Sequence, residues 1–158
     1  MNVLKHNDQN FVIGKDEILY RVIDFPSGVV KGTDGQVDPK AFRLYRKNGH
    51  YISMIRQQYA TEEEVVCQGK AIMKHLMDND QFYGFVTLPA KVFFELQLNF
   101  RLTLDSYFEP SFTGHAGFSY WLDCRTRLTT LREYEAAPEE HVTICTILCS
   151  EASKVKKC

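Results

Sequence analysis

The run Thr61-Glu62-Glu63-Glu64 and the apolar residues after it place the strongest constraint on how this chain folds. A threonine followed three residues later by a glutamate forms a capping box. The hydroxyl of Thr61 is expected to accept a backbone N–H at the start of a helix, and the side chain of Glu64 to reach back to the Thr61 amide. Apolar residues then recur at helical spacing and share one side. These are Val65, Val66, Ile72, Met73, Leu76 and Met77. The pattern predicts an amphipathic helix over about residues 62–77.

Most of the remaining chain favours strands. Residues 18–23, 82–88 and 117–122 are rich in β-formers. From Leu98 to Asp105 apolar and polar residues alternate, which is the period of a half-buried strand. Residues 141–149 are also β-rich, and we expect a last strand there.

Two shorter helices are expected, one from Pro89 to about Glu95 and an amphipathic one over residues 125–135. Residues 26–40, with their glycines and prolines, predict a long loop. Helices set among many strands indicate an α+β fold with a mixed or antiparallel sheet and two main helices, at about 62–77 and 125–135. We expect one domain over residues 1–158, with flexible termini at 1–10 and 151–158.

The chain has 158 residues, of which 44% are hydrophobic, and a net charge of −1. This composition predicts a packed globule, and the balanced charge makes nucleic acid an unlikely partner. We interpret the basic stretch at Arg43, Arg46, Lys47 and Arg56 as a solvated surface, with phosphate binding as the alternative. No secretion signal or apolar run of about 20 residues is visible, so we expect a cytoplasmic protein without a membrane partner.

The sequence offers no metal site and no familiar catalytic loop. Its five cysteines and five histidines lack the short paired spacings of zinc sites. On the expected strand, Cys145 and Cys149 would lie about 13 Å apart, too far to share a metal, and we interpret both as core thiols. Neither a Walker-type phosphate loop nor a Gly-x-Gly-x-x-Gly motif occurs.

A few polar residues beside the strands remain as candidates for a site. Arg21 lies within an apolar strand, so it forms an ion pair or presents a guanidinium to an anion. Tyr51 could stack on a base while Ser53 fixes a ribose, although Tyr51 also suits a half-buried strand position. One of Glu62, Glu63 and Glu64 could face a pocket in addition to stabilising the helix start.

The densest cluster of polar groups is residues 109–117, which contain Ser111, Thr113, His115 and two glycines. Glycines allow a backbone to approach a ligand, and His115 could serve as an acid or a base. The alternative for this segment is a tight turn with a hydrogen-bonded histidine.

Taken in order, these pieces resemble the RES-type toxin domain, a branch of the ADP-ribosyltransferase-like fold. The resemblance rests on Leu19-Tyr20-Arg21, Tyr51-Ile52-Ser53, the early glutamate at residues 60–64, and Pro110-Ser111 followed by His115. It implies cleavage of NAD at the nicotinamide–ribose bond. In that case Arg21 would hold the pyrophosphate, Tyr51 would stack, Glu64 would stabilise the ribose cation and Ser111 would line the pocket. The family's Gly-Arg-Trp-Asn segment is absent here.

Two functions therefore remain open at this point. The first is an enzyme or binding domain for a dinucleotide such as NAD, in a toxin or defence context. The second is a non-catalytic module that binds another protein, such as an immunity protein, an inhibitor or an adaptor. The high aromatic content suits the second, because aromatic residues are enriched in interfaces.

Overall fold

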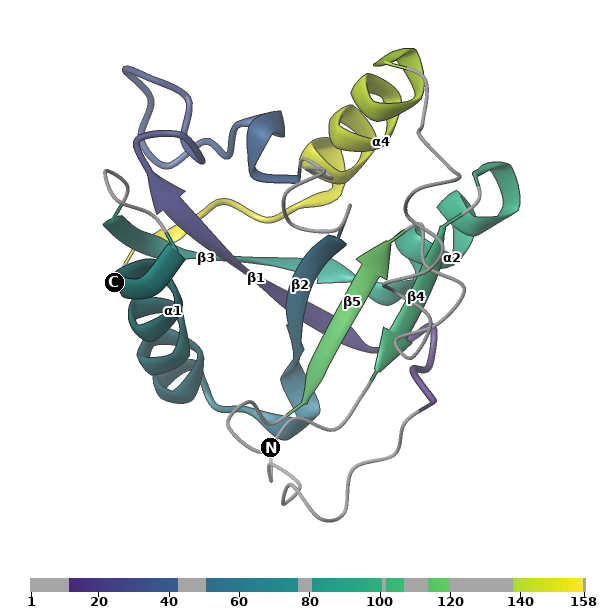
Figure 1. Ribbon diagram of the computed structural model, residues 1–158, viewed down its shortest axis with the longest axis horizontal. Coiled ribbons are helices and arrows are strands. Elements are labelled where there is room, and N and C mark those ends of the chain that lie inside the picture. The colour runs from purple at the N-terminus through teal and green to yellow at the C-terminus, as the bar shows by residue number, and fades with distance from the viewer. Residues whose placement is uncertain are drawn as a thin grey trace.

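A computed structural model describes residues 12–42, 51–76, 81–100, 102–106, 114–119 and 138–157. Six strands form one sheet in the order β4-β5-β2-β1-β3-β6, and every neighbouring pair is antiparallel (Figure 1). The strands are β1 (Ile18–Phe25), β2 (Tyr51–Arg56), β3 (Gln81–Pro89), β4 (Thr103–Ser106), β5 (His115–Ser119) and β6 (Lys156–Lys157). The expected α+β fold with an antiparallel sheet is confirmed.

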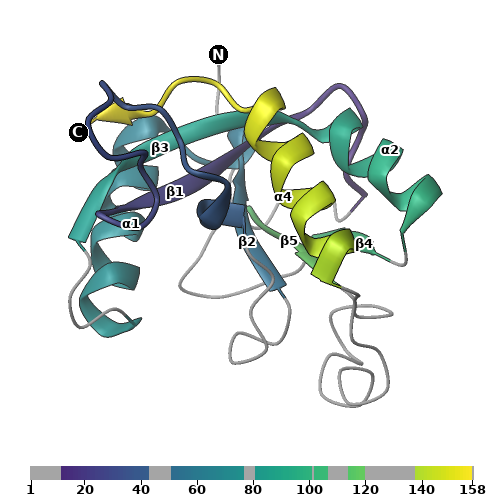
Figure 2. The same ribbon diagram turned by 90° about the horizontal axis from the view of Figure 1, so that it is seen from above.

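Helices cover both faces of this sheet. The α-helices are α1 (Glu62–Leu76), α2 (Ala90–Asn99) and α4 (Pro138–Glu151), and the 3-10 turns are η2 (Pro39–Phe42) and η4 (Gln57–Tyr59). Helix α1 packs on β1 and β3, whereas α4 packs on η2, β3 and α2. Figure 2 shows α2 and α4 side by side, with α1 apart from them. Strand β1 therefore lies between two helical layers, which explains why its sequence is apolar on both sides.

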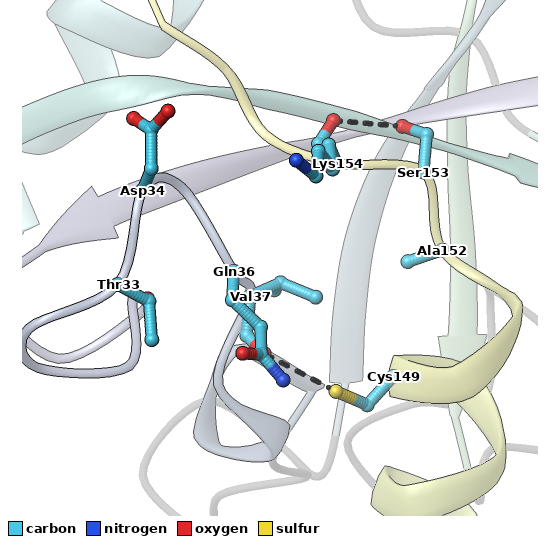
Figure 3. Close-up of a pocket in the computed structure, with 8 residues that line it drawn as sticks. All are labelled: Thr33, Asp34, Gln36, Val37, Cys149, Ala152, Ser153 and Lys154. Carbon is cyan, nitrogen blue, oxygen red and sulfur yellow. Dashed lines mark hydrogen bonds between the residues drawn. The ribbon is translucent and has the colours of Figure 1, made fainter.

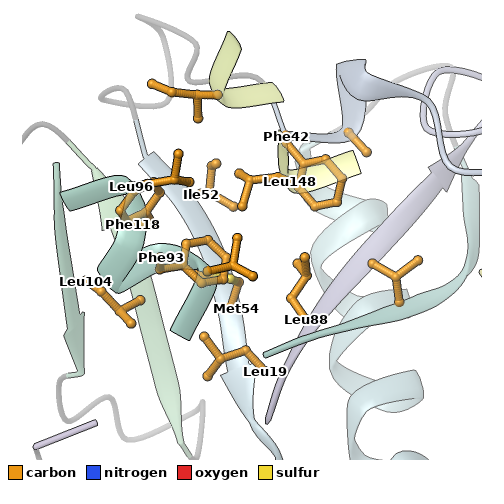
Figure 4. Close-up of a cluster of buried hydrophobic side chains, with 14 of the residues drawn as sticks. Leu19, Phe42, Ile52, Met54, Leu88, Phe93, Leu96, Leu104, Phe118 and Leu148 are labelled. Carbon is orange, nitrogen blue, oxygen red and sulfur yellow. The ribbon is translucent and has the colours of Figure 1, made fainter. Parts of the chain in front are cut away.

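The larger core lies between the sheet, α2, α4 and η2 (Figure 4). Phe93 of α2 and Phe118 of β5 meet edge to face there, with ring centroids 4.9 Å apart. A smaller core under α1 contains Tyr20 and Phe85, whose rings are 5.2 Å apart at 81°. Alternate residues of β1, β2 and β3 enter the two cores, so the position of a residue along these strands fixes the face on which it lies.

The predicted start of α1 and the predicted cap by Thr61 are confirmed. The helix begins at Glu62, and the backbone N–H of Glu64 donates to Thr61 Oγ1 at 3.2 Å. Three glutamates in the first turn add favourable charge at the positive end of the helix dipole. The capping pattern therefore predicted both the helix α1 and the residue at which it begins.

Replacing Thr61 with alanine tests this cap. We expect Thr61→Ala to lower the free energy of unfolding by about 1 kcal/mol, because one N–H at the helix start loses its acceptor. Thr146→Ala is the matched control, since Thr146 is exposed on α4 and should change stability by less than about 0.5 kcal/mol. Urea unfolding followed by circular dichroism measures both, and equal effects of the two changes would contradict a capping role.

The strand expected over residues 141–149 is wrong, because this segment is the helix α4. Ile144, Cys145 and Leu148 are buried at helical spacing, and packing on η2 and α2 outweighs the β-propensity of the segment. The separation of about 13 Å expected between Cys145 and Cys149 is also wrong, because it assumed a strand. The two thiols lie one helical turn apart and donate to Phe42 O at 3.4 Å and Val37 O at 3.2 Å.

The strand expected from Leu98 is also shorter than the alternation indicated. Helix α2 runs on through Asn99, so Leu98 is helical and 85% exposed, and β4 begins only at Thr103. The helix that follows Pro89 buries Ala90, Phe93 and Leu96 at helical spacing. This buried face stabilises the helix through Asn99, so Leu98 and Asn99 do not join the strand.

Near the C-terminus, Lys156 and Lys157 form β6 beside Phe85 and Gly84, and the expected flexibility of residues 151–158 stays a prediction. Lys157 also lies over the ring of Tyr83, 5.4 Å from its centroid. The expected flexible segment 1–10 and the expected helix 125–135 lie outside the described residues.

Candidate functional site

Strands β1 and β2 stay paired over only a short length. Their register covers Leu19 with Arg56 and Tyr20 with Ile55, whereas β1 pairs with β3 along all of its residues. Beyond Tyr20 the two strands diverge (Figure 1). The residues of β2 that precede Ile55 therefore face a side chain of β1 where a paired strand would present its backbone.

The side chain of Arg21 bridges this divergence. Its Nη1 donates to the backbone oxygen of Ser53 at 2.9 Å, and its Nε and Nη2 donate to the backbone oxygen of Ala41 at 3.2 and 3.0 Å. The guanidinium thus joins β1, β2 and η2 through neutral carbonyl oxygens. At these three bonds Arg21 satisfies backbone acceptors and adds positive charge beside Ser53.

Ser53 and His115 form the main side-chain pair of the candidate site. Ser53 Oγ and His115 Nε2 are 2.7 Å apart. Antiparallel pairing sets Ser53 against Gly117 and Ile55 against His115, so Ser53 and His115 are diagonal neighbours on one face. In the tautomer with a proton on Nδ1, the serine hydroxyl donates to Nε2, which is the arrangement in which a histidine can activate a hydroxyl.

The position of His115 is fixed by β4. His115 is only 7% exposed, and its backbone oxygen accepts from Ser106 Oγ at 3.3 Å. The same hydroxyl accepts from Arg56 Nη1 at 3.0 Å. A buried arginine therefore supports the strand that carries the imidazole.

Arg21 and His115 contact Ser53 from opposite faces of the sheet. By alternation Arg21 shares a face of β1 with Leu19 and Ile23, toward the larger core. The side chains of Ser53 and His115 lie on the opposite face, which they share with Ile55. The guanidinium contacts the backbone of Ser53, and the imidazole contacts its hydroxyl. The sheet thus joins these three predicted residues into one chain of contacts.

Gly114, just before His115, packs against the chain that enters α1. Its φ is +70°, and a Cβ atom added there would lie 2.6 Å from Cβ of Tyr59 in η4. Its backbone oxygen accepts from the Arg56 N–H at 2.8 Å. Within the polar segment 109–117, Gly114 therefore adjoins the residues directly before α1.

The remaining predicted site residues are less closely connected. Glu64 is exposed in the first turn of α1, and its described hydrogen bond is the backbone bond to Thr61. Tyr51 begins β2 opposite Ser119, but its side chain lies outside the description. Ser111 and Thr113 also lie outside the described residues. The structure thus joins Arg21, Ser53 and His115 and leaves the other four without a described contact to them.

The interpretation of Arg56 as part of a basic surface is wrong, as is its phosphate-binding alternative. Arg56 is 0% exposed and forms two 2.8 Å bonds with the carboxylate of Glu17. Its guanidinium also lies 4.7 Å from the centre of the Tyr59 ring. A signal was present in the sequence, because Arg56 continues the core-facing alternation of Ile52 and Met54.

Within the described ranges, no group of three or more histidine, cysteine or acidic side chains is arranged to hold a metal ion. In the same ranges, no helix has the length and apolar character to cross a membrane. Comparison with family models, curated proteins and solved structures gives no match to this chain.

Proposed function

We propose that this chain binds a dinucleotide such as NAD beside the Ser53–His115 pair and cleaves it at the nicotinamide–ribose bond. The observation that carries the proposal is the 2.7 Å contact between Ser53 Oγ and His115 Nε2. It couples a hydroxyl to a histidine within a sheet whose neighbouring strand supplies the positive charge of Arg21. A hydroxyl can bind a ribose and an imidazole can transfer a proton, while the guanidinium on the other face of the sheet adds positive charge that favours an anionic ligand.

In this proposal each predicted residue has a separate task. Arg21 holds the backbone of Ser53 from the other face of the sheet and adds positive charge behind the site, Tyr51 stacks on the nicotinamide, and Ser53 orients the ribose or the attacking water. Glu64 stabilises the positive charge that develops on the ribose. Ser111 and Thr113 complete the binding surface from the segment that ends at Gly114. The proximity of Gly114 to Tyr59, which lies just before α1, supports a site that includes Glu64.

The proposed reaction is a hydrolysis. The bond between the ring nitrogen of nicotinamide and C1′ of the ribose breaks, and the electron pair leaves with neutral nicotinamide. The oxygen of a water molecule bonds to C1′. The proton of that water passes to Ser53 Oγ while the hydroxyl proton of Ser53 moves to His115 Nε2. General acid–base assistance of this kind contributes about 100-fold to 10,000-fold in rate.

The experiment that tests the proposal measures nicotinamide released from NAD by chromatography. We expect the purified chain to release nicotinamide and His115→Gln to lower the rate by about 100-fold or more. Ser53→Ala should also lower it, whereas Ser150→Ala, at an exposed position on α4, should not. Circular dichroism verifies that each variant is folded.

A thermal-shift titration separates binding from cleavage. NAD at about 100 times its dissociation constant should stabilise the folded chain by about 2.7 kcal/mol. Stabilisation without nicotinamide release would support the proposed binding of NAD and contradict its cleavage. If NAD neither stabilises the chain nor is consumed, the proposal is wrong.

A protein-binding module is the second candidate function. Leu98 on α2 and Val142 on α4 are 85% and 65% exposed, although these two helices pack on each other. Exposed apolar side chains on adjoining helices suit contact with another protein. Isolation of the chain with a stoichiometric partner, lost in the double change Leu98→Ser and Val142→Ser, would favour this function.

A further inference from the structure

A pocket lies between the turn at residues 33–37 and the end of α4 (Figure 3). Its volume is about 300 Å³, a size that holds a small molecule. Thr33, Asp34, Gln36 and Val37 line one side, and Cys149 and Lys154 line the other. Helix α4 packs on the face of the sheet toward the larger core, so this pocket is separate from Ser53 and His115.

Hydrogen bonds fix both walls of the pocket. The N–H of Val155 donates to Gly35 O at 3.1 Å, and Cys149 Sγ donates to Val37 O at 3.2 Å. Ser153 is bound to Thr87 of β3 through its N–H and its hydroxyl. Burial, and then the charge of Asp38, raise the pKa of the Cys149 thiol, which favours the protonated form that donates to Val37 O. A pocket held in this way loses little conformational entropy when a ligand binds.

Three polar side chains at the pocket are not engaged by the described part of the protein. The carboxylate of Asp34, the amide of Gln36 and the ammonium of Lys154 form no hydrogen bond or ion pair with any described residue. In Figure 3 Asp34 and Lys154 project from the two facing segments, and Val37, Ala152 and Cys149 supply apolar surface. Two opposite charges thus border one small pocket without pairing with each other.

We propose that this pocket binds a small zwitterion of the α-amino acid class, a property independent of the dinucleotide proposal. The ligand's ammonium group contacts Asp34, and its carboxylate contacts Lys154 and the amide of Gln36. Its side chain lies against Val37 and Ala152. Both charged residues are exposed, so each ion pair is weak and the dissociation constant falls in the millimolar range.

Protection of Cys149 from alkylation tests this proposal, because Cys149 lines the pocket whereas Cys67 is exposed on α1. The full chain is treated with iodoacetamide at mildly alkaline pH, and mass spectrometry follows each cysteine separately. L-Alanine at about ten times its dissociation constant should slow alkylation of Cys149 by about tenfold. It should leave Cys67 unchanged. N-acetyl-L-alanine and L-alaninamide each lack one charge and should protect at least threefold less well.

Matched variants locate the binding. Asp34→Asn and Lys154→Gln should each raise the concentration of L-alanine needed for protection by at least threefold. Lys31→Gln, at an exposed position just before the turn that does not line the pocket, should leave it unchanged. The proposal is overturned if L-alanine up to about 100 mM gives no protection, if the N-acetylated analogue protects equally, or if neither pocket variant weakens protection.

Discussion

Replacing Glu17 with glutamine is expected to lower the free energy of unfolding by about 3–5 kcal/mol, because it leaves the buried charge of Arg56 without its carboxylate. The Arg56 side chain is 0% exposed and that of Glu17 is 15% exposed. Glu17 also accepts from the N–H of Gly14 and from the amide of Gln58. One carboxylate therefore joins the residues before β1 to the end of β2. Urea unfolding followed by circular dichroism measures the change.

Glu62→Gln is the matched control, since it makes the same chemical change in an exposed ion pair with Lys156. Exposed pairs contribute about 0–1 kcal/mol, so the two variants should differ by at least about 2 kcal/mol. The double change Glu17→Gln with Arg56→Met should recover part of the loss, because it removes the buried charge as well. A Glu17→Gln protein as stable as the Glu62→Gln protein would contradict a structural role for this pair.

Gly114→Ala is expected to cost about 2–5 kcal/mol, the second large effect. The φ of +70° at Gly114 costs a residue with a Cβ atom about 1–2 kcal/mol. The added carbon would also lie 2.6 Å from Tyr59 Cβ, which is too close for real atoms. Relief of that overlap moves η4 or the start of β5, at about 1–3 kcal/mol. Because Gly114 precedes His115, the movement should also disturb the contact with Ser53.

Gly32→Ala isolates the two causes. Gly32 has a φ of +79°, and an added Cβ atom would meet nothing within 4 Å. This variant should therefore show the conformational cost alone, about 1–2 kcal/mol. Equal losses of stability at Gly114 and Gly32 would mean that the contact with Tyr59 contributes nothing.

Local patterns in the sequence predicted the elements whose stability is mostly local. Helix α1 carries its own cap at Thr61, and β1 and β3 lie in apolar runs bounded by turn residues, so each could be located from its own residues. The segment at 141–149 could not. Its isoleucines, threonines and cysteines favour a strand, and only contact with η2 and α2 makes it helical. That contact joins residues about a hundred positions apart, as in the bond from Cys145 to Phe42.

The sequence predicted which residues belong to the candidate site, but it did not predict which of them contact each other. Ser53 and His115 stood out as polar residues beside strands, but their pairing depends on the register between β2 and β5. The described hydrogen bonds of Arg21 go to backbone oxygens, and no pattern of side chains identifies an accepting carbonyl. The buried pair of Arg56 and Glu17 depends in the same way on which strands become neighbours.

The most direct test of the central claim is the response of the His115 imidazole to NAD. The chain has five histidines, and a nitrogen-15 NMR spectrum of the ring nitrogens, with His115→Gln as the assignment control, identifies the signals of His115. We expect NAD to shift the His115 Nε2 signal in proportion to its occupancy, and Ser53→Ala to change that shift. If NAD reaches saturation or high excess while the His115 signals stay unchanged, a dinucleotide site beside Ser53 and His115 is contradicted.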